Sequence, residues 1–92
     1  GMHIAFLGDV SLAKEKGMEG RTYISRFSSE GGEGAWYERF GLEDGKLVSA
    51  VFINKFEDKR IIEVLMKERR DCTEYISYLS DPSAILTDVI PM

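Results

Sequence analysis

Residues that commonly carry catalysis or covalent cross-links are scarce in this chain. Its 92 residues include one cysteine, one histidine, one tryptophan and two prolines. A single cysteine, Cys72, excludes an internal disulfide and fits a reducing compartment, so we expect a cytoplasmic protein. His3 has no serine, cysteine or acid at motif spacing, and Cys72 has no second cysteine with which to bind a metal. We therefore expect no catalytic, metal-binding or cofactor-binding residue in this chain.

Long apolar runs and clustered basic residues are also absent. Apolar runs are only a few residues long, so we expect no membrane-spanning segment. Sixteen acidic residues outnumber 12 basic ones, and the formal charge of −4 argues against a nucleic-acid partner. The glycine-rich segment 30–34 lacks the Gly-x-Gly-x-x-Gly spacing of a dinucleotide-binding loop and is expected to be a hairpin loop. The polar segment 10–20 is expected to be a loop as well.

The residues that are present are typical of one small globular domain over residues 1–92, with 43% of the chain hydrophobic. Asp44 and Gly45 tolerate the positive φ that a two-residue hairpin turn needs. The segment after this turn is apolar on both faces, with Leu47 and Val51 on one and Ala50 on the other, which predicts a central strand covered on both sides. Strand-like patterns occur at residues 3–7, 21–29, 35–42 and 46–53.

Helical patterns follow the last strand. Asn54 and Glu57 have the spacing of a helix N-cap and its reciprocal carboxylate. Asp71 predicts the cap of a second, short helix, which Asp81 and Pro82 end. The sequence therefore predicts an α+β domain: an antiparallel β-meander of about four strands, followed by one longer and one short helix packed on one face. The apolar residues at helical spacing in the longer helix are Ile61, Ile62, Leu65 and Met66.

The sequence also predicts an exposed apolar surface. The expected strands carry more aromatic surface than two short helices can cover. The tail after Pro82 carries further apolar side chains. Core packing is the alternative role for the aromatic residues. If the surface is exposed, we expect a homodimer. The candidate interface residues are Trp36, Tyr37, Ile85, Leu86, Val89 and Ile90.

Residues 37–54, Tyr-Glu-Arg-Phe-Gly-Leu-Glu-Asp-Gly-Lys-Leu-Val-Ser-Ala-Val-Phe-Ile-Asn, resemble the core of a known family. This family is the small C-terminal domain of FAD-dependent pyridine nucleotide-disulfide oxidoreductases, in the branch of NADH–rubredoxin reductases and the flavoprotein part of NADH-nitrite reductases. There a tyrosine precedes a strand, an Asp-Gly turn, Leu-Val-Gly-Ala-Val and a helix, and Ser49 stands here where the family usually has glycine. The opening run at residues 2–9 and the Asp-Pro pair before the last apolar residues also fit the family's order.

The resemblance implies that the chain is the C-terminal interface domain of a larger flavoprotein, excised from it and inactive alone. It implies FAD and NAD(P)H as cofactors of that parent, held mainly in its larger domains, and none held here. The implied partners are the flavin- and NAD-binding domains, a twin subunit and an electron-transfer protein. The sequence leaves one alternative open: an independent interaction or regulatory module with no flavoprotein parent. A self-contained enzyme is the least favoured interpretation, because no nucleophile–base pair or ligand cluster is visible.

Overall fold

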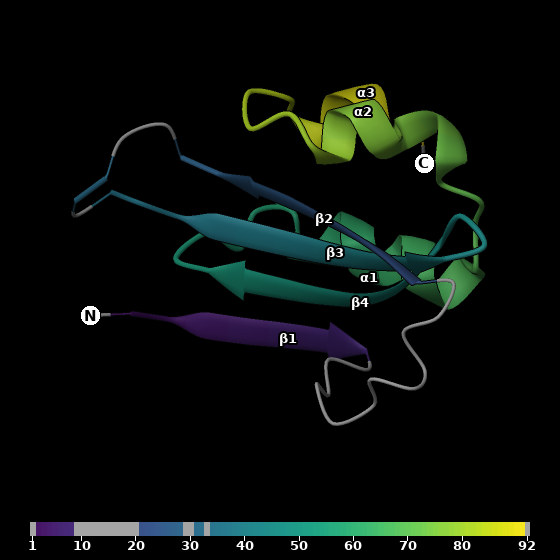
Figure 1. The fold of residues 1–92 in the computed structure, drawn as a ribbon, viewed down its shortest axis with the longest axis horizontal. Coiled ribbons are helices and arrows are strands. Elements are labelled where there is room, and N and C mark those ends of the chain that lie inside the picture. Colours follow the sequence, from purple (N-terminus) through teal and green to yellow (C-terminus); the bar gives the residue numbers. More distant parts are fainter. Residues whose placement is uncertain (1, 9–20, 29–30, 33, 92) are drawn as a thin grey trace.

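The computed structural model describes residues 2–8, 21–28, 31–32 and 34–91 (Figure 1). Four strands form one antiparallel sheet: β1 (Ile4–Gly8), β2 (Arg21–Phe27), β3 (Tyr37–Glu43) and β4 (Lys46–Ile53). The helices follow the sheet in sequence: α1 (Lys59–Glu68), α2 (Ile76–Leu79) and α3 (Leu86–Val89), with a 3₁₀ turn, η2 (Thr73–Tyr75), leading into α2. The expected loops at residues 10–20 and 30–34 lie wholly or partly outside the described residues.

The α+β architecture predicted from the sequence is confirmed. Strands β2, β3 and β4 form the expected meander, and β4 occupies the predicted central position between β1 and β3. The first strand is not adjacent to β2. It pairs antiparallel with β4, so that Ile4 lies opposite Ile53, and the sheet order is β1-β4-β3-β2 (Figure 1).

One face of the sheet carries the hydrophobic core. Helix α1 packs against β4 and α2 packs against β2. The rings of Phe40 and Phe52 meet edge to face in this core, with their centroids 6.2 Å apart. The predicted apolar stripe of α1 is buried here, except for Met66, which is partly buried. The buried core residues are Ile24, Phe40, Leu42, Leu47, Ala50, Phe52, Ile61, Ile62, Leu65, Cys72, Tyr75, Leu79, Leu86 and Ile90.

The central hairpin turns at the predicted pair. Asp44 has a φ of 53° and Gly45 a φ of 77°, the positive values that a two-residue hairpin turn requires. The carbonyl oxygen of Gly45 accepts a hydrogen bond from the backbone N–H of Cys72 at 2.7 Å. The turn is therefore tied to the segment that follows α1.

A β-bulge shifts the faces of β4 from those expected. Leu42 pairs with Leu47 while Gly41 pairs with Ser49, so β4 contains one extra residue, Val48. The bulge brings Leu47 to the same buried face as Ala50, and the expected assignment of these two residues to opposite faces is wrong. The other face of β4 is only half-buried, so the expected coverage on both sides is wrong as well.

Helix α1 begins later than the sequence predicts. It starts at Lys59, and the predicted N-cap at Asn54 is wrong. Asn54 has a φ of 60°, and its Oδ1 accepts a hydrogen bond from the backbone N–H of His3 at 2.8 Å. Its own backbone N–H donates to the carbonyl oxygen of His3 at 2.9 Å. Asn54 therefore ends β4 and holds the start of β1, a role set by tertiary pairing.

The cap predicted at Asp71 is wrong by one residue, because the N-cap of η2 is Cys72, which makes no side-chain cap hydrogen bond. Asp71 Oδ1 accepts hydrogen bonds from the backbone N–H and the hydroxyl of Thr73, at 2.9 and 2.5 Å. Asp71 therefore shapes the turn that leads into η2, and the short helical segment ends at Leu79.

Gly45→Val should destabilise the domain by about 1–3 kcal/mol. Valine resists the positive φ at this position, and a Cβ there would collide with the side-chain oxygens of Thr73 and Asp71. Urea denaturation followed by circular dichroism measures the loss. Gly31→Val is the matched control, because no atom lies within 4 Å of a Cβ at Gly31. Equal stability of the two variants would contradict the assigned turn.

Asn54→Ala should lower the free energy of unfolding by about 1–2 kcal/mol, because it removes the side-chain bond to His3 and places alanine, which tolerates the left-handed region less well than asparagine, at positive φ. Glu57→Ala should change the same quantity by less than about 0.5 kcal/mol, since Glu57 is exposed and precedes α1. In a capping box, both substitutions would destabilise the domain to a similar extent. Equal losses of unfolding free energy in urea titrations would therefore support the predicted cap at Asn54.

Candidate functional site

The sheet face opposite the core carries apolar side chains that remain exposed. In an antiparallel sheet, directly paired residues point to the same face. Two such rows cross all four strands on this side. We call these eight residues the open face: Ile4, Ile53, Tyr37 and Phe27 in one row, and Phe6, Val51, Arg39 and Ser25 in the next.

The exposure of the open face is concentrated on its two edge strands. On β1, Ile4 is 44% and Phe6 57% exposed, and on β2, Phe27 is 59% exposed. The side chains of the central strands β3 and β4 in the same rows are half-buried. Large apolar side chains that remain exposed on one face of a sheet are typical of protein–protein contact sites.

Polar groups on the open face are held in defined positions. The hydroxyls of Ser25 and Tyr37 are hydrogen-bonded at 2.9 Å. The guanidinium of Arg39 lies 4.1 Å from the centre of the Tyr23 ring. Gly41 leaves room for that ring, because a Cβ at Gly41 would come within 3.1 Å of it. Tyrosine and arginine are the residues that contribute strongly to binding at interfaces.

The predicted interface residues separate into different environments. Leu86 and Ile90 are 0% and 2% exposed in the core, so the apolar tail folds back onto its own domain. The prediction that Leu86 and Ile90 are interface residues is therefore wrong, because both side chains lie in the core. Val89 packs partly against the same core, whereas Ile85 is 60% exposed. Tyr37 alone of these five lies on the open face.

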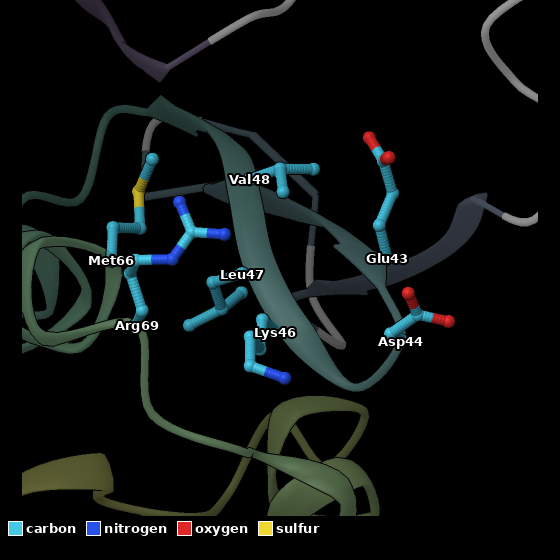
Figure 2. Close-up of a pocket in the computed structure, with 7 residues that line it drawn as sticks. All are labelled: Glu43, Asp44, Lys46, Leu47, Val48, Met66 and Arg69. Carbon is cyan, nitrogen blue, oxygen red and sulfur yellow. The ribbon is translucent and has the colours of Figure 1, made fainter.

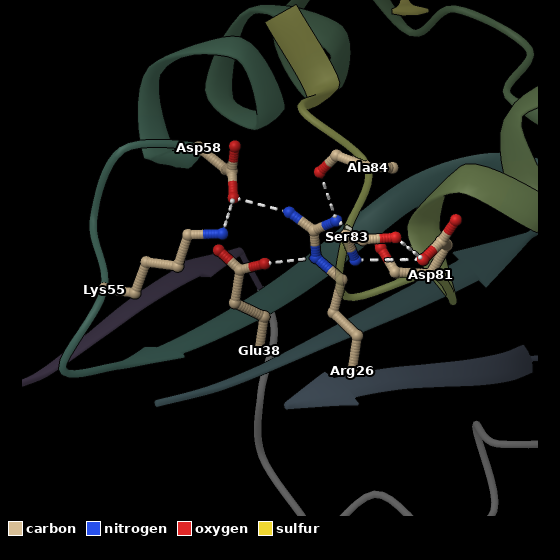
Figure 3. Close-up of polar contacts among 7 residues, drawn as sticks. All are labelled: Arg26, Glu38, Lys55, Asp58, Asp81, Ser83 and Ala84. Atoms are coloured by element: carbon tan, nitrogen blue, oxygen red, sulfur yellow. Dashed lines mark hydrogen bonds and ion pairs between the residues drawn. The ribbon is translucent and has the colours of Figure 1, made fainter. Parts of the chain in front are cut away.

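A cluster of buried charged side chains lies on the core side of the sheet (Figure 3). The side chain of Arg26, from β2, has no exposed surface. Its Nε donates to Glu38 Oε1 at 2.6 Å, and its Nη2 donates to Asp58 Oδ2 at 2.7 Å. Its Nη1 donates to the carbonyl oxygens of Asp81 and Ala84, at 2.8 and 2.9 Å. One guanidinium therefore connects β2 to β3, to the start of α1 and to the C-terminal segment.

Lys55 and the remaining predicted interface residue, Trp36, border this cluster. The Nζ of Lys55 lies 3.3 Å from Asp58 Oδ2 and 4.1 Å from the centre of the Trp36 ring. The guanidinium carbon of Arg26 lies 5.7 Å from the same ring centre. Trp36 is half-buried, and these contacts place it beside the cluster and away from the rows of the open face.

The two carboxyl groups of the cluster have opposite pKa shifts. Burial and hydrogen bonding to Asp58 raise the pKa of Glu38 from 4.5 to about 7, against the opposing effect of Arg26. Burial acts to raise the pKa of Asp58 as well. Hydrogen bonding to Glu38 and the charges of Lys55 and Arg26 outweigh it and bring that pKa below 3.8. The pair therefore holds one proton in mildly acidic solution, with the negative charge on Asp58.

Sequence reasoning missed this cluster. An arginine on an alternating strand is normally read as solvent-exposed, and its partners lie far along the chain at residues 38, 58, 81 and 84. One signal was available, because alternation puts Arg26 on the same side of β2 as Ile24, a core residue.

A cavity of about 220 Å³ lies between the end of the β3–β4 hairpin and the end of α1 (Figure 2). Glu43 is already engaged, since Arg21 Nε donates to its Oε2 at 2.9 Å. The described residues of the lining include no serine, cysteine or histidine, so no nucleophile–base pair is seen among them. It is lined by Glu43, Asp44, Lys46, Leu47, Val48, Met66 and Arg69.

Cys72 has the properties of a structural thiol. It is fully buried in the core, and burial raises the pKa of its thiol. Among the described residues, no group of three or more His, Cys, Asp or Glu side chains could hold a metal ion. In the same part of the chain, no helix is long and apolar enough to cross a membrane. No protein-family model, curated protein or solved structure matches the chain.

Arg26→Leu should lower the free energy of unfolding by about 3–5 kcal/mol, because it leaves Glu38 and Asp58 buried without their guanidinium partner. Arg39→Leu is the matched control: it removes the same group from the open face and should cost less than about 1 kcal/mol. Urea and thermal denaturation at pH 7 measure both. An Arg26→Leu variant as stable as Arg39→Leu would show that water reaches the cluster.

Proposed function

We propose that this chain is an interface domain whose role is to present the open face to another protein surface. The observation that carries the proposal is the exposure of Ile4, Phe6 and Phe27 on a sheet face to which the described helices contribute no packing (Figure 1). Within the described part of the chain, the residues of the buried cluster and of the cavity near α1 form no nucleophile–base pair. A binding role therefore accounts for more of the described structure than a catalytic role does.

We further propose that the chain is the C-terminal domain of an FAD- and NAD(P)H-dependent oxidoreductase. The support is the resemblance at residues 37–54, which form β3, the Asp-Gly turn and β4. In such a parent, both cofactors would lie in the larger nucleotide-binding domains, and this domain would hold neither. A cytoplasmic location fits the single buried cysteine.

The occupant that we propose for the open face is a second copy of this chain. An apolar surface is complementary to itself across a twofold axis, so the same rows can pack against their equivalents. The two rows contain no carboxylate, and their one charged group, Arg39, is stacked on the Tyr23 ring. Tyr37 and Ser25 offer hydroxyls to the partner. In the parent, the twin subunit would supply this second face; the flavin domain or an electron-transfer protein is the competing occupant.

One observation favours a second candidate function, an independent interaction or regulatory module without a flavoprotein parent. Leu86 and Ile90 complete the core from within the chain, so the domain does not borrow core residues from a parent at these positions. The two candidates share the open face and differ in what precedes the domain. An upstream coding sequence with a Gly-x-Gly-x-x-Gly turn between a strand and a helix would favour the flavoprotein parent.

Wild-type protein should be dimeric in sedimentation equilibrium at micromolar concentration, and the double variant Phe6→Ser/Phe27→Ser should be monomeric. The substitutions remove apolar area from the proposed contact, which should weaken the dimer by at least about tenfold. Ile85→Ser is the matched control, because Ile85 is equally exposed at 60% but lies in the C-terminal segment.

Circular dichroism confirms that each variant is folded before its mass is measured. If the wild-type protein is monomeric, the proposal that a second copy of the chain occupies the open face is wrong. A dimer that Ile85→Ser disrupts, and that the double variant leaves intact, would move the interface from the open face to the tail.

A further inference from the structure

The outer edge of β4 is left open over a short stretch beside the end of α1. Strand β1 ends at Gly8, which pairs with Ser49. An isolated bridge joins Lys46 to Asp71 in the segment after α1. Val48, the extra residue of the β-bulge, lies between these two contacts. The described strands therefore leave a gap at Val48, and the cavity of about 220 Å³ lies against it (Figure 2).

Arg69, which ends α1, has an unusual backbone conformation. Its φ of 53° and ψ of 42° lie in the left-handed region, where a helix usually ends with glycine. The other described non-glycine residues with positive φ are Asp44 and Asn54, whose short polar side chains tolerate this region. Arginine has no such advantage, so its place here costs backbone energy that a functional role of its side chain would explain.

The guanidinium of Arg69 is available to a ligand. In Figure 2 it points from the end of α1 toward β4, between Met66 and Leu47. Among the described residues its side chain has no hydrogen bond or ion pair, in contrast to the guanidinium groups of Arg21 and Arg26. Arg69 is also exposed, so a ligand can reach it from solvent.

The rest of the described lining places apolar surface beside this charge and does not neutralise it. Val48 and Met66 are half-buried and bound the cavity with hydrocarbon. Glu43 is already held by a hydrogen bond from an arginine of β2. In Figure 2 the carboxylates of Glu43 and Asp44 point away from Arg69, on the other side of the β4 ribbon. Lys46 adds a second positive charge to the lining.

We propose that this cavity binds a small carboxylate with an apolar body, whose carboxylate group is held by the guanidinium of Arg69. The planar fork of a guanidinium matches a carboxylate through two parallel N–H bonds, and the apolar wall takes the remainder of the ligand. Phosphate suits this lining less well, because it has no apolar part and would bring a second negative charge near Asp44. A volume of about 220 Å³ equals about seven waters of about 30 Å³ each, so the ligand has about six to ten non-hydrogen atoms.

This site is independent of the proposed dimer. The described lining of the cavity includes none of the eight open-face residues. The double variant Phe6→Ser/Phe27→Ser should therefore bind the ligand as tightly as the wild-type protein does, whichever oligomeric state is found.

Isocaproate, a branched carboxylate of this size, is the probe, and NMR of the nitrogen-15-labelled chain is the measurement. It should cause saturable shifts at residues 44–48 and 66–69, with a dissociation constant of about one millimolar, as expected for so small a ligand. Isocaproamide has the same shape without the charge, and acetate has the charge without the apolar body. Each should bind at least about tenfold more weakly than isocaproate.

Arg69→Gly separates binding from folding. Glycine tolerates the left-handed region, so this variant should keep the wild-type urea midpoint or exceed it, yet bind isocaproate at least about tenfold more weakly. Arg69→Gln, which keeps a long polar side chain without the charge, should lose affinity to the same extent. Arg60→Gln is the matched control: it removes an exposed arginine of α1 that does not line the cavity, and it should keep the wild-type affinity.

The proposal is wrong if isocaproate causes no saturable shift at residues 44–48 and 66–69, or if isocaproamide or acetate binds as tightly. It is also wrong if both Arg69 variants keep the wild-type affinity, or if Arg60→Gln loses as much affinity as they do. Shifts spread over many exposed lysines and arginines would indicate a general attraction of anions to the surface and would likewise overturn it.

Discussion

The guanidinium of Arg26 is the contact on which the arrangement of this domain depends. It joins β2 to Glu38 on β3, to Asp58 at the start of α1 and to the backbone of the turn that follows α2. A buried arginine is tolerated only where its N–H groups find acceptors, and the acceptors of Arg26 come from three separate segments. The same requirement fixes where those segments can lie. The helices and the tail are thereby placed on one face of the sheet, and the opposite face is left with its apolar side chains exposed.

Features that depend on neighbouring residues could be predicted from the sequence. The turn at Asp44 and Gly45 needs only the backbone preferences of two residues, and the strand after it is apolar enough to be central in any sheet. The start of α1 could not be predicted in this way. Asparagine is a favoured N-cap residue, so the local sequence around Asn54 predicts a helix start. In the structure its side-chain oxygen instead accepts a hydrogen bond from the backbone N–H of His3, which lies 51 positions earlier. Tertiary pairing at that point overrides the local preference.

The candidate sites show the same division. Alternation identifies which residues of one strand share a face, so Ser25 and Phe27 could be placed on the same side of β2 before their surroundings were known. Periodicity cannot tell whether an apolar tail covers its own core or another molecule, which is why Leu86 and Ile90 were assigned to an interface and are core residues. Alternation could place Arg26 on the core side of β2, but it could not identify the partners of Arg26, because residues 26, 38 and 58 become neighbours only when the sheet and α1 pack together.

The position of β1 couples folding to recognition. Its pairing with β4 joins residues nearly 50 positions apart, Ile4 with Ile53, so it closes a long loop and lies at an edge of the sheet. The strands β2, β3 and β4 can pair through shorter loops without it. Yet β1 supplies Ile4 and Phe6, two of the most exposed side chains of the open face. A protein partner that contacts the complete open face therefore binds only molecules in which β1 is paired with β4. By mass action it favours that docking, so the edge strand and the partner stabilise one another.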